Sequence, residues 1–253
     1  MASSDFDGRI VLVTGAEGGI GSAIARAFLT AGAQVYLTGV RAEAGTALAG
    51  ELGPRAAYLE LDVTQPAAWQ RVVEHIVQRH GHVDVLVNNA GYLKPGLTLE
   101  TTSLEEWRRH FAVNTDSVLI GCQAVLPHLA RQGSIVNVAS AVGVRLHADA
   151  PAYGVSKAAN IALTRVAAQY CGRLGRGIRV NAVLPGPVDT AMMRSNVATE
   201  EQFRTLEAAL VAKYPMERIG QPADIARAVL FLASPQSAYV NGAALTVDGG
   251  QTA

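Results

Sequence analysis

RIVLVTGAEGGIG, residues 9–21, is the stretch that decides the fold. Its first half is a short run of β-branched and aliphatic residues that ends in glycine, which is typical of a buried strand. Its second half places Gly15, Gly19 and Gly21 in the spacing G-x-x-x-G-x-G, directly before an amphipathic helical pattern that is closed by Gly32. The stretch therefore predicts a strand, a tight turn and a helix in direct succession.

A glycine-rich turn between a strand and a helix can bind a phosphate group. Without Cβ atoms the backbone can approach the phosphate closely, and the start of the helix supplies free N–H groups and a positive dipole end. At the beginning of an alternating α/β chain, this spacing favours a dinucleotide site. The alternative is that the glycines only let the helix and the strand pack closely.

Strand and helix patterns alternate along the rest of the chain. Helical stretches of crossover length separate the strand patterns, so the strands should be parallel. We expect a Rossmann-type doubly wound parallel α/β sheet of about seven strands, flanked by helices on both faces. After residues 9–15, the strand patterns lie at residues 33–39, 56–64, 83–91, 134–140, 178–186 and 242–250.

The alternation is not divided by any linker rich in proline or serine, which indicates a single domain over residues 1–253. Two helical patterns lie near residues 104–110 and 111–132, and a long helix begins at about residue 152. A polar, helix-rich segment follows the sixth strand pattern. We expect this segment, at about residues 189–215, to form a mobile lid over the substrate.

Composition excludes several classes of protein. The 21 basic and 21 acidic side chains cancel and no block of like charge occurs, which argues against a nucleic-acid partner or a membrane-attracting patch. No apolar run approaches the length of a membrane span, and the first residues lack a basic signal region. Cys122 and Cys171 form neither a disulfide framework nor a metal-binding motif. We expect a soluble cytoplasmic protein without a metal site.

PAYGVSKAAN, residues 151–160, places a phenol and an ammonium one helical turn apart. Residues i and i+4 share one face of a helix, so Tyr153 and Lys157 should point the same way. Taken alone, the pair fits an ordinary solvated helix face. The alternative is that the cation lowers the pKa of the phenol and turns it into a proton donor for catalysis.

Several motifs together resemble the short-chain dehydrogenase/reductase family. They are the glycine turn, NNAG at residues 88–91, Tyr153-x-x-x-Lys157, and LPGPVDT at residues 184–190. Ser140 precedes Tyr153 by thirteen positions, as that family places its serine. VNTDSVLIGCQ, residues 113–123, is similar to the corresponding stretch of bacterial hydroxysteroid and secondary-alcohol dehydrogenases. The likeness extends from Arg9 to the final VDGG and implies the family's fold and activity.

The resemblance implies a catalytic set of four residues. Tyr153 would give a proton to the forming alkoxide or take one from the alcohol, and Lys157 would lower the pKa of its phenol. Ser140 would hydrogen-bond the substrate oxygen, although a serine that only forms a turn at the strand end would look the same. Asn114 would hold a water that links Lys157 to solvent.

The resemblance also implies a set of cofactor contacts. Asp62 would meet the adenine amino group, while Val188 and Thr190 would hold the nicotinamide carboxamide. On residue type alone, Asp62 could equally cap a strand end and Thr190 could cap a helix. The full set consists of Gly15, Glu17, Gly18, Gly19, Ile20, Gly21, Gly39, Arg41, Asp62, Val63, Asn89, Ala90, Gly91, Tyr153, Lys157, Pro185, Gly186, Val188 and Thr190.

The residues at the end of the second strand pattern bear on the choice of nicotinamide cofactor. An acid there normally binds the adenosine ribose and repels a 2′-phosphate. This sequence has Gly39 at that place, and Arg41 could reach a phosphate. Against this, the glycine turn carries Glu17 and no base, and Val40 stands where many NADP-binding members have arginine. The pattern favours NADP(H) over NAD(H) by a narrow margin.

The residues expected to line the substrate are mostly apolar. They come from residues 92–95, 141–146 and 192–210, where Lys94 and Arg145 are the local cations. A neutral ketone or secondary alcohol of moderate size would fit such a lining. The lining residues are Tyr92, Val142, Leu146, Met192 and Met193.

We therefore expect an NAD(P)-dependent oxidoreductase that interconverts a hydrophobic ketone and its secondary alcohol. Two alternatives remain: a reductase of 3-oxoacyl groups bound to a carrier protein, and a nucleotide-binding partner protein without turnover. The resemblance also implies a homotetramer, packed through the helices near residues 111–132 and 152–173.

Overall fold

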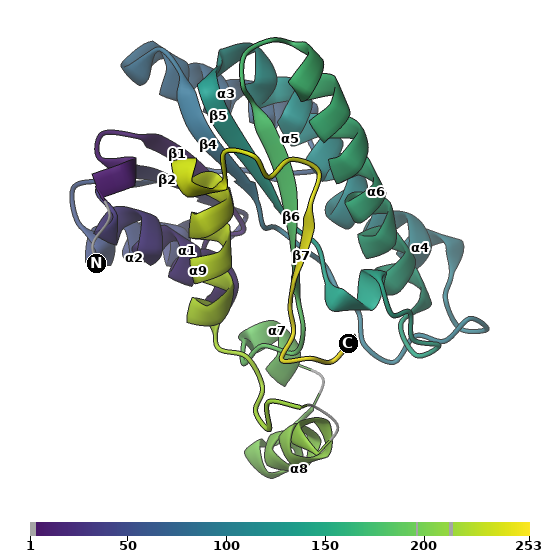
Figure 1. The fold of residues 1–253 in the computed structure, drawn as a ribbon. Coiled ribbons are helices and arrows are strands. Elements are labelled where there is room, and N and C mark those ends of the chain that lie inside the picture. Colours follow the sequence, from purple (N-terminus) through teal and green to yellow (C-terminus); the bar gives the residue numbers. More distant parts are fainter. Residues whose placement is uncertain (1–3, 196, 213–214) are drawn as a thin grey trace.

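The computed structural model describes residues 4–195, 197–212 and 215–253, which build one continuous parallel sheet with helices on both sides (Figure 1). The seven strands lie in the order β3-β2-β1-β4-β5-β6-β7, and every neighbouring pair is parallel. The predicted doubly wound α/β sheet is confirmed. The strands are β1 Ile10–Thr14, β2 Gln34–Gly39, β3 Ala56–Glu60, β4 Val83–Asn88, β5 Leu129–Val138, β6 Arg179–Pro185 and β7 Ala244–Val247.

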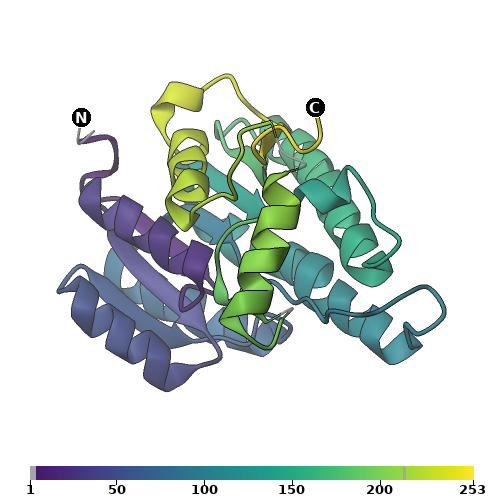
Figure 2. The same cartoon turned by 90° about the horizontal axis from the view of Figure 1, so that it is seen from below.

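Helices cover both faces of the sheet, as Figure 1 shows. On one face lie α1 Gly19–Thr30, α2 Ala42–Leu52 and α9 Pro222–Ala233. On the other lie α3 Pro66–His80, α5 Ser117–Val125 and α6 Pro151–Arg173, with α4 Leu104–Phe111 beside α6. Two further helices, α7 Ala191–Arg194 and α8 Glu200–Val211, lie at the carboxyl ends of the strands, and α8 crosses in front of the sheet in Figure 2.

The core consists of two apolar layers separated by the sheet. In β1, Val11 and Val13 pack into the layer under α1 and α9, whereas Ile10 and Leu12 pack into the layer under α3, α5 and α6. All five residues of β1 are buried, which explains why its sequence reads as a continuous apolar run without polar alternation.

The second helical pattern, expected over residues 111–132, is wrong in its bounds. The chain forms a π-helical turn, Ala112–Asp116, before α5, and β5 already begins at Leu129, where it pairs with Val83. Pro127 has no backbone N–H and cannot continue the helical hydrogen bonds. Apolar residues that continue a helical pattern into a buried strand cannot be distinguished from helix by periodicity.

Within the described ranges, no helix is long and apolar enough to cross a membrane. In the same residues, no group of three or more His, Cys, Asp or Glu side chains is placed to hold a metal ion.

The strand order reverses beside β1, since β2 and β3 extend to one side of it and β4 to β7 to the other. In open α/β sheets, ligands bind outside the carboxyl ends of the strands at such a reversal. The turn after β1 and the turn after β4 therefore mark the part of the molecule in which to look for a site.

Candidate active site

Four residues that are far apart in the sequence meet at the carboxyl ends of β4 and β5. The Lys157 ammonium lies 5.9 Å from the centre of the Tyr153 ring. The Tyr153 phenol hydrogen-bonds with the Ser140 side chain. Asn114 lies beside them, because a Cβ atom placed on Gly91 would be 3.5 Å from both the Asn114 Oδ1 and the Lys157 Nζ. The structure thus brings together the whole set expected to be catalytic.

Ser140 is positioned by the turn that follows β5. It begins a short 3₁₀ turn, Ala141–Gly143, and its hydroxyl accepts a hydrogen bond from the Val142 N–H at 3.2 Å. Gly143 brings this turn against α6, since a Cβ atom there would lie 2.8 Å from the Lys157 carbonyl carbon. A larger residue at position 143 would push the Ser140 turn away from Tyr153.

Burial dominates the electrostatics of the Tyr153–Lys157 pair. It raises the pKa of Tyr153, against the lowering effect of the hydrogen bond with Ser140, and it lowers the pKa of Lys157 to about 8. Lys157 is 3% exposed and donates a hydrogen bond to the Val138 carbonyl at 2.9 Å. The pKa of the phenol is therefore raised in the protein alone, and the lowering expected from Lys157 is not found. Loss of water favours the neutral form of both groups.

Asn114 is fully buried in the π-helical turn between α4 and α5. Its Nδ2 donates to the Tyr92 carbonyl at 2.9 Å and to the Ser156 hydroxyl at 3.0 Å, and its Oδ1 accepts from the Tyr92 N–H at 2.9 Å. Its carbonyl accepts from Asn160 Nδ2 at 2.9 Å. π-Helical turns occur often at functional sites, where they redirect one residue of a helix.

Ser156 and Asn160 are residues that the sequence analysis missed. They lie three and seven positions after Tyr153, on the face of α6 that also carries Lys157. Ser156 also donates to the Tyr153 carbonyl at 2.8 Å. The helical spacing was the available signal. A search for small polar residues on the helix face that carries Tyr153 and Lys157 would have found both.

The glycine turn after β1 is tied to the loop after β4. Gly15 has a φ of +60°, and a Cβ atom there would lie 2.9 Å from the Ala90 Cα. Asn89 Nδ2 donates to the Thr14 carbonyl at 2.8 Å and to the Gly15 carbonyl at 3.1 Å. The Thr14 hydroxyl accepts from the Asn89 and Ala90 N–H groups, each at 3.0 Å. Asn89 therefore holds the shape of the glycine turn.

The opposite side of the glycine turn contacts the turn after β6. A Cβ atom on Gly19 would lie 2.9 Å from the Thr190 Cγ2. The Thr190 hydroxyl accepts from the Met193 N–H at 3.3 Å and so caps α7. Gly186 makes the turn possible, because a Cβ atom there would lie 2.7 Å from the Asp248 Cα. Gly18 caps the start of α1, Ile20 packs in the first helical turn, Pro185 ends β6, and Val188 pairs with Gly220.

Asp62 and Val63 follow the end of β3. Asp62 is exposed, and its Oδ1 accepts from the Thr64 N–H at 2.9 Å and from the Thr64 hydroxyl at 2.7 Å. Val63 is buried, and its carbonyl accepts from the Trp69 indole at 3.0 Å. Asp62 thus caps the turn after β3, and its contact with the adenine stays a prediction.

Two of the expected substrate-lining residues lie directly beside the catalytic helix. A Cβ atom on Gly154 would be 3.1 Å from Leu146 and 3.4 Å from Val142. Leu146 is 57% exposed, so it presents an apolar surface next to Tyr153. Met192, in α7, is also exposed, whereas its neighbour Met193 is partly buried.

Tyr92 belongs to a cluster on α4. Its hydroxyl donates to Glu106 at 3.1 Å, the Arg109 guanidinium lies 4.4 Å from its ring centre, and the His110 ring centre is 4.8 Å away. Burial and the hydrogen bond with Glu106 raise the pKa of Tyr92. These contacts fix the side chain toward α4, and the three partners were missed in the sequence.

The local cations are engaged by other groups of the chain. Lys94 Nζ lies 2.9 Å from the Glu106 carboxylate, and Arg145 donates to the Gln251 carbonyl at 2.9 Å. The charge of Lys94 is thus paired with an acid, whereas Arg145 contacts a neutral carbonyl and keeps its charge.

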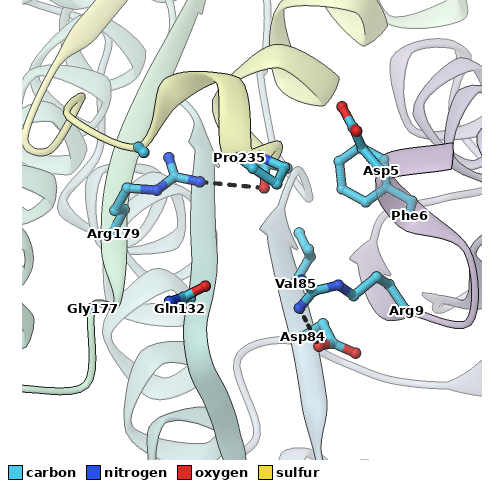
Figure 3. Close-up of a pocket in the computed structure, with 11 residues that line it drawn as sticks. Asp5, Phe6, Arg9, Asp84, Val85, Gln132, Gly177, Arg179 and Pro235 are labelled. Atoms are coloured by element: carbon cyan, nitrogen blue, oxygen red, sulfur yellow. Dashed lines mark hydrogen bonds and ion pairs between the residues drawn. The ribbon is translucent and has the colours of Figure 1, made fainter. Parts of the chain in front are cut away.

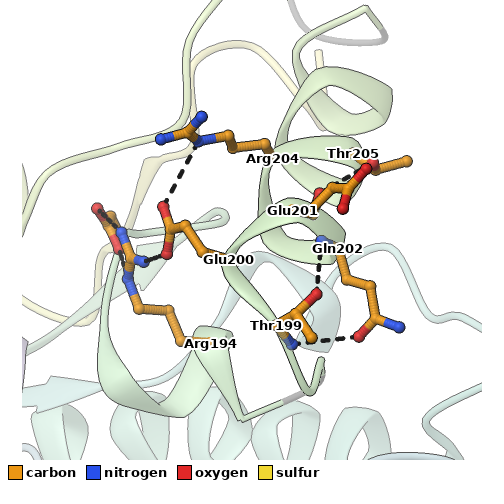
Figure 4. Close-up of polar contacts among 8 residues, drawn as sticks. Arg194, Thr199, Glu200, Glu201, Gln202, Arg204 and Thr205 are labelled. Carbon is orange, nitrogen blue, oxygen red and sulfur yellow. Dashed lines mark hydrogen bonds and ion pairs between the residues drawn. The ribbon is translucent and has the colours of Figure 1, made fainter.

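The segment after β6 is held by exposed ion pairs (Figure 4). The Arg194 guanidinium lies 2.8 Å from both the Asp189 and the Glu200 carboxylates and 4.0 Å above the Phe203 ring centre. Phe203 is 3% exposed and anchors α8. The lid expected at residues 189–215 is described only in part, because residues 196, 213 and 214 lie outside the described residues.

A pocket of about 290 Å³ lies at the other end of the sheet, between the starts of β1, β4 and β6 (Figure 3). Its arginines are held by the protein itself: Arg9 lies 2.8 Å from Asp84, and Arg179 donates to the carbonyls of Leu232, Ala233 and Ser234 at the end of α9. These contacts close the end of a helix and explain a buried arginine without a ligand.

The comparisons with known proteins agree over nearly the whole chain. A profile of the family described as enoyl-(acyl carrier protein) reductase matches residues 15–252. The 3-beta-hydroxysteroid dehydrogenase of Comamonas testosteroni is 38% identical over 248 residues, which is 96% of this chain and 95% of the relative.

Two solved structures are similar in fold and sequence. A short-chain dehydrogenase/reductase from Brucella melitensis has a TM-score of 0.91 and 32% identity, with 99% of each chain covered. A blue fluorescent protein from a metagenomic library, solved with NADPH, has a TM-score of 0.88 and 37% identity, with 98% of this chain and 100% of that chain covered.

Proposed function

Because the chain belongs to the short-chain dehydrogenase/reductase family and is an oxidoreductase of CH–OH and C=O groups, we propose that it interconverts a neutral, hydrophobic ketone and its secondary alcohol. The observation that carries the proposal is the meeting of Tyr153, Ser140, Lys157 and Asn114 at the carboxyl edge of the sheet, beside the glycine turn. A protein that only binds a nucleotide has no need of all four groups in one place.

The residues at this edge fit a nicotinamide dinucleotide. Gly15 and Gly19 let the turn pack against Ala90 and Thr190, where a Cβ atom would collide. The turn leads into the start of α1, whose N–H groups would bind a phosphate. Asp62 and Val63 would hold the adenine, and Val188 and Thr190 the carboxamide. The bound cofactor would supply or accept the hydride.

The protein's own residues would transfer the proton. In the direction of ketone reduction, Tyr153 would donate its phenolic proton to the substrate oxygen, and Ser140 would donate a hydrogen bond to the same oxygen. The raised pKa of Tyr153 keeps the phenol protonated and ready to donate. Alcohol oxidation needs the phenolate instead, which a cation close to the phenol would favour.

Lys157 and Asn114 would return a proton to the Tyr153 phenol after each ketone reduction. With a pKa of about 8, Lys157 can exchange protons near neutral pH, and its Nζ and the Asn114 Oδ1 both lie 3.5 Å from where a Cβ atom on Gly91 would be. We propose that Asn114 holds a water that connects Lys157 with solvent.

The charges around the site support a neutral substrate. Lys94 is paired with Glu106, while Leu146 and Met192 expose apolar surface. One relative is named a 3-beta-hydroxysteroid dehydrogenase, and a hydroxysteroid would suit such an apolar surface. We propose α7 and α8 as the lid that closes over such a substrate.

A reductase of carrier-bound 3-oxoacyl groups is the second candidate, since a relative from Vibrio cholerae that is 38% identical over 248 residues is named a 3-oxoacyl-[acyl-carrier-protein] reductase. Docking of an acidic carrier protein needs a basic surface, and the net charge of zero gives little support for one.

Two observations point in opposite directions on the choice between NADP(H) and NAD(H). A relative binds NADPH, in line with the narrow preference for NADP(H) drawn from the sequence. In this chain, however, Arg41 donates to the Glu17 carbonyl at 3.0 Å, so it is engaged by the glycine turn.

We also propose a homotetramer. Apolar side chains are exposed along α5 and α6, where Leu119 is 44%, Val166 64% and Tyr170 58% exposed. Such surfaces are typical of contacts between subunits.

A panel of ketones and secondary alcohols, assayed by nicotinamide absorbance with NAD(H) and NADP(H), tests the reaction and the substrate class together. We expect turnover of bulky neutral ketones or alcohols. Turnover confined to carrier-bound acyl groups would favour the second candidate.

A further inference from the structure

The glycine turn places the carboxylate of Glu17 over the carboxyl end of β2. The Glu17 side chain is only 6% exposed. Its Oε1 accepts hydrogen bonds from the Val40 N–H at 3.1 Å and from the Arg41 N–H at 3.4 Å. Its Oε2 is buried and has no hydrogen-bond partner among the described residues. Burying a carboxylate oxygen without a donor is costly, so this oxygen is available to a ligand that brings one.

Gly39 makes this placement possible. A Cβ atom on Gly39 would collide with both carboxylate oxygens of Glu17. Gly39 does not have a positive φ, so glycine is required here for space and not for backbone conformation. The acid that short-chain dehydrogenases often carry at the end of the second strand is absent, and a carboxylate from the glycine turn fills the same place.

The charge of this region is negative on balance. Arg41 donates to the Glu17 carbonyl at 3.0 Å, and its Nε lies 3.8 Å from the Glu17 Oε1. Near Tyr58, this one cation faces two acids, Glu17 and Glu60. The pKa of Tyr58, whose hydroxyl donates to the Gly39 carbonyl at 2.8 Å, reflects the nearby charges. Burial raises the pKa of Tyr58 most, Glu17 and Glu60 raise it further, and Arg41 lowers it.

We infer that Glu17 accepts hydrogen bonds from the adenosine ribose hydroxyls and makes the enzyme select NAD(H) over NADP(H). The inference rests on the proposed function, which supplies the dinucleotide. A ribose diol brings the donors that a buried carboxylate oxygen lacks. A 2′-phosphate would bring negative charge to the same oxygen, and Arg41 is already engaged there.

The test is the affinity of the full-length protein for NADH and NADPH, measured by calorimetric titration without substrate. We expect NADH to bind at least about tenfold more tightly than NADPH to the unchanged protein, which is the size of a modest charge effect. Glu17→Gln keeps the shape of the side chain but removes its charge, and we expect it to move the ratio of the two Kd values at least about tenfold toward NADPH. A ratio left unchanged by Glu17→Gln would overturn the inference.

Glu43→Gln is the matched control. Glu43 is an exposed acid in the first turn of α2, close to Arg41 in the sequence, so its replacement removes the same charge from the same region. We expect the ratio of the two Kd values to stay as in the unchanged protein. An equal shift in Glu43→Gln and Glu17→Gln would mean a general field effect and would overturn the specific role of Glu17.

A double variant that moves the acid to another position provides a second test, which does not depend on Glu17→Gln. Glu17→Ser combined with Gly39→Asp removes the acid from the turn and returns one to the end of β2. Because the acid again reaches the ribose, we expect the preference for NADH to be regained relative to Glu17→Ser alone. A double variant that binds both dinucleotides but stays at the ratio of Glu17→Ser would contradict the inference.

The two levels of the proposal fail differently. If the unchanged protein binds neither NADH nor NADPH, the proposed function fails. If it binds both equally, or NADPH more tightly, the proposed function stands and the role of Glu17 is overturned.

Discussion

The polar side chains packed near Tyr153 and the polar side chains of the lid both make many contacts, but they differ in burial. Asn114, Lys157 and Asn160 are at most 3% exposed. Asn160 donates to the Asn114 carbonyl, Asn114 donates to Ser156, and Lys157 donates to the Val138 carbonyl. In the lid, the side chains of Arg194 and Glu200 are 42% and 60% exposed and are joined by ion pairs. We call the first group the buried network and the second the lid ion pairs.

The difference teaches what each region has to do. A buried polar group that loses its partner costs about 1–3 kcal/mol, so the buried network tolerates essentially one arrangement. Exposed ion pairs contribute about 0–1 kcal/mol, so the lid can break and remake them with little cost. A proton transfer needs fixed distances, whereas the entry of a substrate needs a segment that can open.

The largest effect should come from Tyr153→Phe, which removes the proton donor and leaves the ring in place. We expect turnover to fall by about 10²–10⁴-fold, the usual contribution of a positioned acid or base. Steady-state kinetics measure the loss, and titration with the dinucleotide should show binding within about twofold of the unchanged protein. Unchanged turnover would remove Tyr153 from the chemistry.

The next largest effect should be on stability, from Asn160→Leu in the buried network. It removes the donor to the Asn114 carbonyl, and we expect the free energy of unfolding in urea to fall by about 1–3 kcal/mol. Gln123→Leu, an exposed amide on α5, is the control and should change it by less than about 0.5 kcal/mol. Equal losses of unfolding free energy in the two variants would contradict the claim that the buried network tolerates only one arrangement.

A smaller effect follows from the pKa of Lys157. Since burial lowers this pKa from 10.5 to about 8, the unfolded chain binds more protons than the folded one between these values, and stability should rise with pH there. Below pH 8 both states are protonated and the slope vanishes. We expect Lys157→Met to lose a rise of about 1–2 kcal/mol between pH 8 and 9.5, measured by urea unfolding at the two values. The same rise in the variant would refute the burial of the charge.

The smallest effect should come from the lid ion pairs. Arg194→Met keeps apolar contact with Phe203 but removes both ion pairs, and we expect little change in the free energy of unfolding because exposed ion pairs are weak. KM should rise by about two- to fivefold with kcat nearly unchanged, because only the closing of the lid is weakened. Arg204→Met, in the neighbouring helix α8, is the comparison. A fall in kcat as large as that of Tyr153→Phe would erase the distinction between the two regions.

The parts of the fold that depend on local patterns could be predicted from the sequence. The glycine turn, the alternation of strands and helices and the Tyr153–Lys157 spacing follow from neighbours within a few residues. The start of β5 could not, because its apolar residues continue the helical pattern and only the pairing of Leu129 with Val83 decides.

The contacts that complete the site depend on distant partners. Asn114 meets Ser156 and Asn160 across more than forty positions, and no local pattern links them. The raised pKa of Tyr153 depends on burial, which the Tyr–Lys spacing does not reveal. Likewise, the absence of an acid at Gly39 suggested an open place for a phosphate, and only the fold shows that Glu17 fills it.

The most direct measurement is a crystal structure of the protein with the dinucleotide and an unreactive substrate analogue that carries a carbonyl or hydroxyl group. We expect the oxygen of the analogue to lie within about 3 Å of both the Tyr153 hydroxyl and the Ser140 hydroxyl, the distance that proton transfer requires. An analogue bound elsewhere, or bound with its oxygen turned away from Tyr153, would contradict the assignment of the proton to this residue.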